Sequence, residues 1–255
     1  MAAAVTETAA SGGVSAAFSY DKSGGDFPQY SNLRLAIVRE GVPGFNGPVA
    51  GAGDGVGPGA GIGKKSLVAR DLDGDGEPEV LVKLFSGGAH CCTISAIYRH
   101  VGTGYAPSTH NWADTGFRIR DLGGDARPEL LSADARFAFL YSSFAESRFP
   151  IRILRYKAGK LTSVTRRFPR LIRRDLRRQK RSFRRLRKHL NPRGALAAVV
   201  ADQYLLKHRK AARRSLRGAL RRGELGKTGD FHTGAFGRAY IRSLKRFLTR
   251  TGYRR

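Results

Sequence analysis

Residues 71–79 read Asp71-Leu72-Asp73-Gly74-Asp75-Gly76-Glu77-Pro78-Glu79. Carboxylates at alternate positions, with glycine where a tight turn needs a positive φ, are the pattern by which a short loop folds its oxygens around a hard cation. The alternative is a surface turn rich in Asp and Gly that holds no ion, but its crowded carboxylates would repel one another. We therefore predict a calcium loop in which Glu77 offers its backbone carbonyl and the side-chain ligands are Asp71, Asp73, Asp75 and Glu79.

The segments on either side of this loop are predicted strands. Residues 66–70 lead in and residues 79–85 lead out, and both are short, largely apolar and bounded by glycine clusters. An EF-hand would need two helices and a bidentate glutamate at loop position 12, which is Val82 here. The sequence therefore predicts a calcium loop between two strands, the arrangement of a β-propeller blade.

The motif Asp-x-Asp-Gly-Asp-Gly-x-x-Glu between two strands resembles the calcium loop of FG-GAP/VCBS-type repeats. The wider run from Asp71 through Ser86-Gly-Gly-Ala-His-Cys-Cys92 to Tyr98 is similar to secreted FG-GAP/VCBS-like proteins of actinobacterial type. The resemblance covers roughly residues 15–170. It implies a secreted, calcium-stabilised binding or scaffold domain, and it does not imply an enzyme.

A second copy of the loop begins at residue 121, 50 residues after the first. Residues 121–131 align with residues 71–81, and this spacing fits a blade-sized repeat. Gly123 replaces a carboxylate of the first loop and Ala126 replaces a turn glycine. We expect weak or absent calcium binding in this degenerate loop, whose acidic residues are Asp121, Asp125 and Glu129. Asp121 and Asp125 would instead accept backbone N–H bonds.

Hydrophobic periodicity divides the chain into three parts. Residues 1–16 are small and polar, which predicts disorder or the remnant of a leader. Residues 17–167 predict an antiparallel, propeller-like β domain, with strands at 17–20, 33–39, 66–70, 79–85, 92–99, 116–120, 129–133, 136–142 and 150–156, and a flexible connection at 41–63. Residues 168–255 predict a small basic helical bundle, with helices near 168–190, 195–206, 211–222 and 235–250. The predicted fold class is α+β.

Charge differs sharply between the two halves of the chain. Residues 1–147 hold 12 Lys/Arg and 16 Asp/Glu, whereas residues 148–255 hold 35 and 4. The polar face of the first predicted helix would bind phosphates or other anions in a salt-dependent way. It therefore predicts an anionic polymer, the cell envelope, a membrane surface or nucleic acid as partner, although a solvated face without a partner explains the pattern almost as well. The predicted anion-binding residues are Arg173, Arg174, Arg177, Arg178, Arg181, Arg184 and Arg185.

Cys91 and Cys92 follow His90 and are the only cysteines of the chain. In an exported protein they would form a strained vicinal disulfide or pack as inert thiols. A metal site would need further ligands. A cysteine nucleophile with His90 as base is a third alternative, but neighbours on a strand point to opposite faces.

The expected role follows from these features together. No run of about 18 apolar residues predicts a membrane span, and the first residues lack the features of a signal peptide. Extracellular calcium would fill a weak loop that cytosolic calcium leaves empty, so we expect export with the true start further upstream, and a cytoplasmic location as the alternative. We predict a non-catalytic, calcium-binding, secreted or cell-surface scaffold with no small-molecule substrate. The alternatives are a nucleic-acid-binding protein acting through the basic helices and an enzyme using the cysteine pair.

Overall fold

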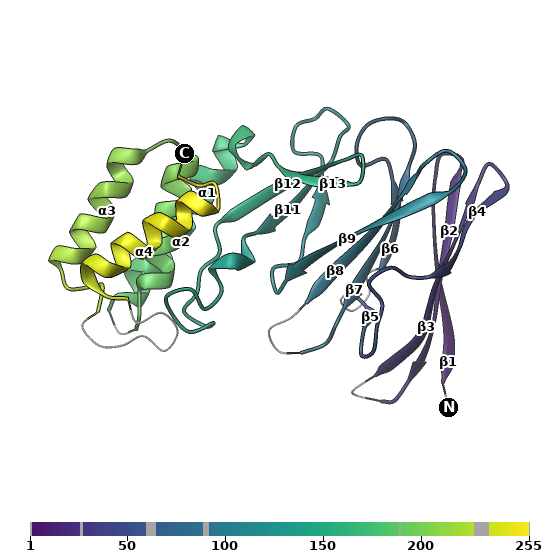
Figure 1. Ribbon diagram of the computed structural model, residues 1–255, viewed down its shortest axis with the longest axis horizontal. Helices are drawn as coiled ribbons and strands as arrows, with labels where there is room; N and C mark the ends of the chain where they lie inside the picture. Colours follow the sequence, from purple (N-terminus) through teal and green to yellow (C-terminus); the bar gives the residue numbers. More distant parts are fainter. Residues whose placement is uncertain are drawn as a thin grey trace. The chain divides into compact units, whose positions relative to one another are not determined.

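The computed structural model describes residues 2–25, 28–59, 65–88, 92–188, 190–226 and 235–254 (Figure 1). The chain forms two compact units. Unit 1 comprises Met1–Ser132 with Leu154–Thr162, and unit 2 comprises Ala133–Ile153 with Ser163–Arg255. Antiparallel sheets and four α-helices make up the described ranges, which confirms the predicted α+β class.

The first sheet of unit 1 is a four-stranded meander in the order β1-β2-β3-β4. Its strands are β1 (Ala3–Ser11), β2 (Val14–Ser23), β3 (Gln29–Arg39) and β4 (Val42–Pro48). Alternate side chains of β2 and β3 are buried, among them Phe18, Leu35 and Ile37, as the period of two requires.

Two segments of this region differ from the sequence-based expectation. Within the predicted disordered leader, residues 3–16 contain β1 and the start of β2, because β1 pairs with β2 along its whole length, from Ala3 opposite Lys22 to Ser11 opposite Val14. Residues 41–63 include β4 and the short β5 (Gly57–Pro58) rather than only a connection. Both segments are rich in small residues, so backbone pairing holds them without a strong apolar pattern.

The second sheet has the order β5-β7-β8-β9, and β6 also pairs with β7. Its longer strands are β6 (Leu67–Arg70), β7 (Glu79–Phe85), β8 (Thr93–His100) and β9 (Tyr105–Ala113). The predicted strands 66–70, 79–85 and 92–99 are therefore present, whereas β9 was not predicted. Antiparallel pairing of β6 with β7 brings Arg70 opposite Glu79 and closes the hairpin that carries the first acidic loop.

The third sheet has the order β10-β11-β12-β13, and the division between the units falls inside β12. Its strands are β10 (Arg118–Arg120), β11 (Glu129–Ala133), β12 (Ile151–Lys157) and β13 (Lys160–Ser163). The strand predicted at 136–142 is wrong. Asp134 accepts a hydrogen bond from the backbone N–H of Arg136 and caps a 3₁₀ helix, η1 (Ala135–Phe137), which replaces it.

Two apolar clusters join the sheets within unit 1. Side chains of the first and second sheets form one cluster, which includes Phe18, Leu35 and Val82. The other cluster includes Leu81 of β7 with Leu130 and Leu154 of the third sheet. Alternate residues of β7 thus contribute to different clusters, and burial of each such side chain is worth about 1.5–3 kcal/mol.

Unit 2 contains the four helices α1 (Pro169–Leu186), α2 (Arg193–Leu205), α3 (Arg209–Arg221) and α4 (Gly237–Arg250). All four were predicted to within a few residues. Every residue of α2 is buried, as its largely apolar sequence indicated. Among the described helices, none combines the length and the low polarity that crossing a bilayer requires. The sequence placed the boundary of this part at residue 168, but residues 133–153 also belong to it.

The interior of unit 2 contains an unusual pair of carboxyl groups. Asp202 of α2 is fully buried, and Asp175 of α1 is 6% exposed. Asp175 accepts hydrogen bonds from the backbone N–H of Ile151 (2.9 Å) and from Gln179 (3.2 Å), and it forms an ion pair with Arg178 at 2.5 Å. Burial raises the pKa of Asp202 well above its ordinary value, and the negative charge of Asp175 raises that pKa further, against a smaller opposing effect of Arg178.

Replacing Asp202 with Asn is expected to remove a pH dependence of stability. At pH values between the ordinary pKa of 3.8 and the raised pKa of the folded protein, the Asp202 carboxyl keeps its proton only in the folded state. The free energy of unfolding therefore falls as pH rises through that window, by up to about 1.4 kcal/mol per pH unit. The Asn side chain has no proton to lose, so Asp202→Asn should be more stable than the wild type at pH 8 and similar to it at pH 4. Urea unfolding at both pH values measures the free energy of unfolding. A difference in this free energy between variant and wild type that is the same at pH 4 and pH 8 would contradict the prediction.

Candidate metal centre

The first acidic loop joins β6 to β7 and is organised by Asp71. One oxygen of its carboxylate, Oδ1, accepts hydrogen bonds from the backbone N–H groups of Asp73 (3.2 Å) and Gly74 (2.6 Å), and the other, Oδ2, accepts one from Gly76 (2.9 Å). Gly74 and Gly76 have φ values of +78° and +89°. These positive φ values explain why glycine occupies both positions, and the loop turns back toward its own carboxylates.

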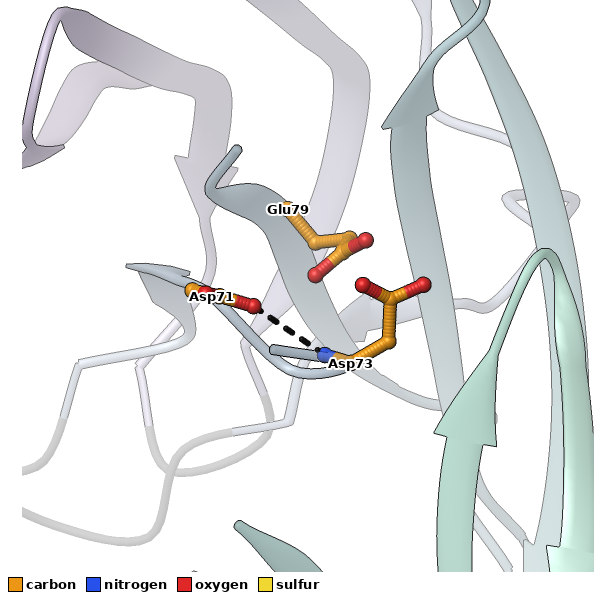
Figure 2. Close-up of side chains that lie close together, drawn as sticks. All are labelled: Asp71, Asp73 and Glu79. Carbon is orange, nitrogen blue, oxygen red and sulfur yellow. Dashed lines mark hydrogen bonds between the residues drawn. The ribbon is translucent and has the colours of Figure 1, made fainter. Parts of the chain in front are cut away.

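Three carboxylates converge at the end of this hairpin. Oxygens of Asp71, Asp73 and Glu79 all lie within 4.8 Å of one another, and Figure 2 shows the carboxylates of Asp73 and Glu79 facing each other. Glu79 is 1% exposed. The structure therefore gathers three of the predicted calcium ligands from two ends of the loop.

Two oxygens of this cluster have no hydrogen-bond donor within the described part of the chain. Glu79 Oε2 accepts from the backbone N–H of Leu72 (2.8 Å), and Asp73 Oδ2 accepts from that of Ala158 (3.1 Å). The remaining oxygens, Asp73 Oδ1 and Glu79 Oε1, are buried and unpaired. Buried polar atoms are rarely left without a partner, because the lost hydration costs about 1–3 kcal/mol each.

The surroundings of the cluster disfavour the ionised form of Glu79. Burial raises the pKa of Glu79 to about 8, and the negative charges of Asp73, Asp75 and Asp71 add to this rise against the opposing hydrogen bond from Leu72. A cation between the carboxylates would reverse the effect, because it favours the ionised form of each.

The other two predicted ligands have different surroundings. Asp75 Oδ1 accepts a hydrogen bond from the backbone N–H of Glu77 (2.8 Å), and Asp75 is not part of the three-carboxylate cluster. The Glu77 side chain binds the guanidinium of Arg39 through both oxygens, at 3.0 Å each. This pairing lowers the pKa of Glu77. The side chain of Glu77 is therefore engaged elsewhere, which is compatible with the prediction that only its backbone carbonyl binds calcium.

Residues near the cluster that the sequence did not indicate come from β12 and the turn after it. Ala158 donates to Asp73. Tyr156 is 1% exposed, and its pKa is raised chiefly by burial and, among other effects, by the charges of Glu79 and Asp73. Both residues lie about 80 positions further along the chain, so no local sequence signal could have linked them to the loop.

The second acidic loop repeats the backbone geometry of the first. Asp121 accepts hydrogen bonds from the N–H groups of Gly124 (2.7 Å) and Ala126 (3.1 Å), and Glu129 accepts one from Leu122 (3.0 Å). Asp125 accepts one from Arg127 at 3.3 Å. Each bond has its counterpart 50 residues earlier. Ala126 adopts a φ of +59°, so the turn is kept although its glycine is replaced.

The two loops differ in what faces the buried glutamate. In the second loop, the guanidinium of Arg155 from β12 donates to Glu129 Oε1 through Nε (3.1 Å) and Nη2, and it also contacts Asp125 at 3.3 Å. Glu129 is fully buried. In the first loop the equivalent oxygen, Glu79 Oε1, has no hydrogen-bond partner among the described residues. A side-chain cation thus occupies the second loop at the point where the first loop leaves its oxygens unpaired.

The remaining predicted site residues fall into two groups. His90 and Cys91 lie outside the described residues, so the vicinal disulfide stays a prediction. Cys92 is buried, and its N–H donates to Ser86 Oγ at 3.0 Å. Arg178 forms an ion pair with Asp175. All seven predicted anion-binding arginines lie on α1 and are exposed: Arg173, Arg174, Arg177, Arg178, Arg181, Arg184 and Arg185.

Comparison with known proteins gives two partial similarities. No family model matches the chain. A stretch of 89 residues is 33% identical to an uncharacterized protein of Sinorhizobium fredii and covers 34% of this chain and 14% of that protein. A stretch of 106 residues is 32% identical to a probable thylakoid lumen protein of Synechocystis sp. and covers 39% of this chain and 30% of that protein. The aligned stretches span less than a third of either relative.

Proposed function

We propose that the protein is a non-catalytic binding or scaffold protein whose first acidic loop binds one calcium ion. The observation that carries this proposal is the contrast between two copies of one loop. In the second loop a buried glutamate is neutralised by Arg155, whereas in the first loop Glu79 and Asp73 present buried, unpaired oxygens. A bound cation would supply in the first loop the charge that a side chain supplies in the second.

The chemistry of the donor set supports calcium. The atoms that converge are carboxylate oxygens, which are hard ligands suited to calcium, magnesium or manganese. Calcium accepts six to eight oxygens in flexible geometry, whereas magnesium demands a nearly octahedral site and gives up its water reluctantly. A loop of turns with several carboxylates and carbonyls suits the larger ion. Asp71, Asp73 and Glu79 would hold it.

The arrangement of unit 1 supports a scaffold role. Three consecutive antiparallel meanders, two of which carry the repeated loop, are consistent with blade-like repeats of the FG-GAP/VCBS type that the loop motif resembles. The similarity of part of the chain to a probable thylakoid lumen protein supports a location outside the cytoplasm, where calcium would be high enough to fill a weak loop.

Calorimetric titration of calcium into the EDTA-treated, dialysed protein tests this proposal. We expect one ion bound per chain, with weaker binding of magnesium. Binding of two ions per chain, or none at 10 mM calcium, would contradict the contrast between the two loops.

A second proposed activity is binding of an anionic polymer by unit 2. This unit contains 33 Lys/Arg against 6 Asp/Glu. Three of its acids, Asp134, Asp175 and Asp202, are buried, and Glu224 pairs with Arg222 at 2.8 Å. The described surface therefore has little negative charge to offset the exposed cations. Such a surface would bind nucleic acid, envelope polymer or an anionic membrane mainly by releasing counterions.

A stripe of α1 is expected to contribute most of this binding. Arg173, Arg177 and Arg181 follow one another at intervals of four residues, so they lie on one side of the helix. Changing all three to Gln should lower the salt concentration at which the protein elutes from heparin and reduce the salt slope of binding to duplex DNA by about 2–3.

The matched control carries the same changes on an equally spaced, exposed stripe of α3, formed by Arg213, Arg217 and Arg221. An equal loss in both variants would show that total charge, and not α1, determines binding. A strong preference for one DNA sequence would favour a nucleic-acid-binding protein instead.

A further inference from the structure

Unit 2 contains a cavity of about 310 Å³ that the calcium loop and the α1 stripe do not use. Its walls come from the start of η1, from β12, from the segment Ser163–Arg167 that precedes α1, from the end of α2 and from the turn Thr251–Tyr253. This volume lies at the lower end of the range for small-molecule sites. The volume of the cavity therefore suits a small ligand.

The lining of the cavity is rich in arginine. Four arginines and a single carboxylate, Asp134, contribute to it, and the arginines are Arg136, Arg152, Arg166 and Arg167. Asp134 is already neutralised, because Arg136 donates to both of its oxygens at 2.8 and 2.6 Å and Tyr253 OH donates at 2.8 Å. The lining residues therefore carry a net formal charge of +3.

The other three arginines differ in their bonds. Arg166 donates to neutral backbone carbonyls of Tyr204, Leu205, Gly252 and Tyr253, at 2.7–3.2 Å. These bonds fix the wall of the cavity between the end of α2 and the last turn. Arg152 and Arg167 have no ion pair with any carboxylate that the structure describes. Their guanidinium groups have the donors and the charge to bind an oxyanion through two parallel hydrogen bonds.

Hydroxyl groups complete the lining. Ser163, Thr165, Thr251 and Tyr253 all contribute to the walls. The hydroxyls of Tyr253 and Thr251 already donate to Asp134 and to the carbonyl of Phe247. The hydroxyl of Ser163 is therefore the one best placed to donate to a phosphate oxygen that a guanidinium leaves free. Burial opposes ionisation of Asp134, yet its pKa is lowered, because the hydrogen bonds from Arg136 and Tyr253 and the nearby charges of Arg136 and Arg152 outweigh burial. The positive charges that line the cavity thus already stabilise the ionised form of a carboxylate in its wall.

We infer that this cavity is a binding site for a small molecule with a doubly charged oxyanion, of the phosphate monoester class, with Arg152 and Arg167 as its principal ligands. Phosphate in its dianionic form carries one negative charge for each of Arg152 and Arg167, and its oxygens suit the paired donors of guanidinium. Arg136 is held by Asp134 and shapes the wall. The inference does not depend on calcium binding or on the proposed polymer binding.

Titration of inorganic phosphate and of phosphoserine into the full-length protein, in EDTA and at constant ionic strength set with NaCl, tests the inference. We expect saturable binding of one phosphate group per chain and a rise in melting temperature of several degrees at tenfold excess over the Kd. Arg152→Gln should weaken binding about tenfold or more, because a charge-assisted hydrogen bond is lost. Tighter binding of phosphoserine than of inorganic phosphate would assign the site to a monoester, and the reverse order to the free ion.

The control variant is Arg214→Gln, which removes an equally charged, exposed side chain of α3 outside the cavity. It should bind phosphate as the wild type does. Arg167 is exposed, so Arg167→Gln serves as a second test that should fold even if Arg152→Gln does not. Equal effects of phosphate and NaCl, or equal losses in the cavity variants and in Arg214→Gln, would overturn the inference.

Discussion

We expect calcium to raise the melting temperature of the wild-type protein, and we expect replacement of Asp73 with Asn to abolish this rise. Asp73 provides one of the two buried, unpaired oxygens of the first loop, so its loss removes a charged ligand from the centre of the site. A ligand present at 100 times its Kd stabilises the native state by about 2.7 kcal/mol, which corresponds to roughly 5–10 °C for a unit of this size. Differential scanning calorimetry in calcium and in EDTA measures the effect.

Two further variants make this experiment specific. Asp114 is exposed and lies in the turn after β9, so Asp114→Asn makes the same change in charge and should keep the full calcium response. Glu79→Gln should lose the response but melt higher than the wild type in EDTA at pH 8–9, because the amide removes a buried carboxyl whose pKa is raised to about 8. A calcium-dependent rise that survives in both Asp73→Asn and Glu79→Gln would place the ion elsewhere.

Replacing Arg155 with Met should destabilise unit 1 by about 3–5 kcal/mol. The guanidinium of Arg155 is the cation that faces Glu129, which is fully buried. Removal of one partner of a buried ion pair leaves an uncompensated charge, and this is far costlier than the loss of a surface pair. Urea unfolding of the variant in EDTA measures the loss.

The double variant Arg155→Met with Glu129→Gln should recover part of the lost stability, since it leaves no buried charge. Arg127 belongs to the same loop but is exposed, so Arg127→Gln should cost less than about 1 kcal/mol. A similarly small loss in Arg155→Met would mean that Glu129 is neutralised by something other than this side chain.

Local signals predicted much of the acidic loop and of the helical part. The alternation of carboxylates with glycine predicted the turn at residues 71–79, and β-branched flanks predicted β6 and β7. The period of 3.6 predicted all four helices. These features are encoded within a few neighbouring residues, which is why sequence alone was sufficient for them.

The parts that were missed depend on partners far along the chain. β1 has few large apolar residues and is held by pairing with β2. Arg155 contacts Glu129 of the second loop, 26 residues away in the sequence. Ala158 contacts Asp73 of the first loop, 85 residues away. The run at 136–142 has the composition of a strand, but Asp134 caps a 3₁₀ helix there. Tertiary contacts override local preference in each case.

The helical unit is assembled from two stretches of the chain. Residues 133–153 leave the sheets after β11 and return within β12, so Phe137 and Tyr141 belong to the same apolar cluster as residues of α2 and α4. A protease that cleaves once near residue 165 would therefore nick the protein without releasing a helical fragment. The amino-terminal product would contain Phe137 and Tyr141, which pack in the same cluster as side chains of the carboxyl-terminal product. A recombinant version of either unit would therefore need its two stretches of sequence joined by a new linker, because a simple truncation would remove one of them.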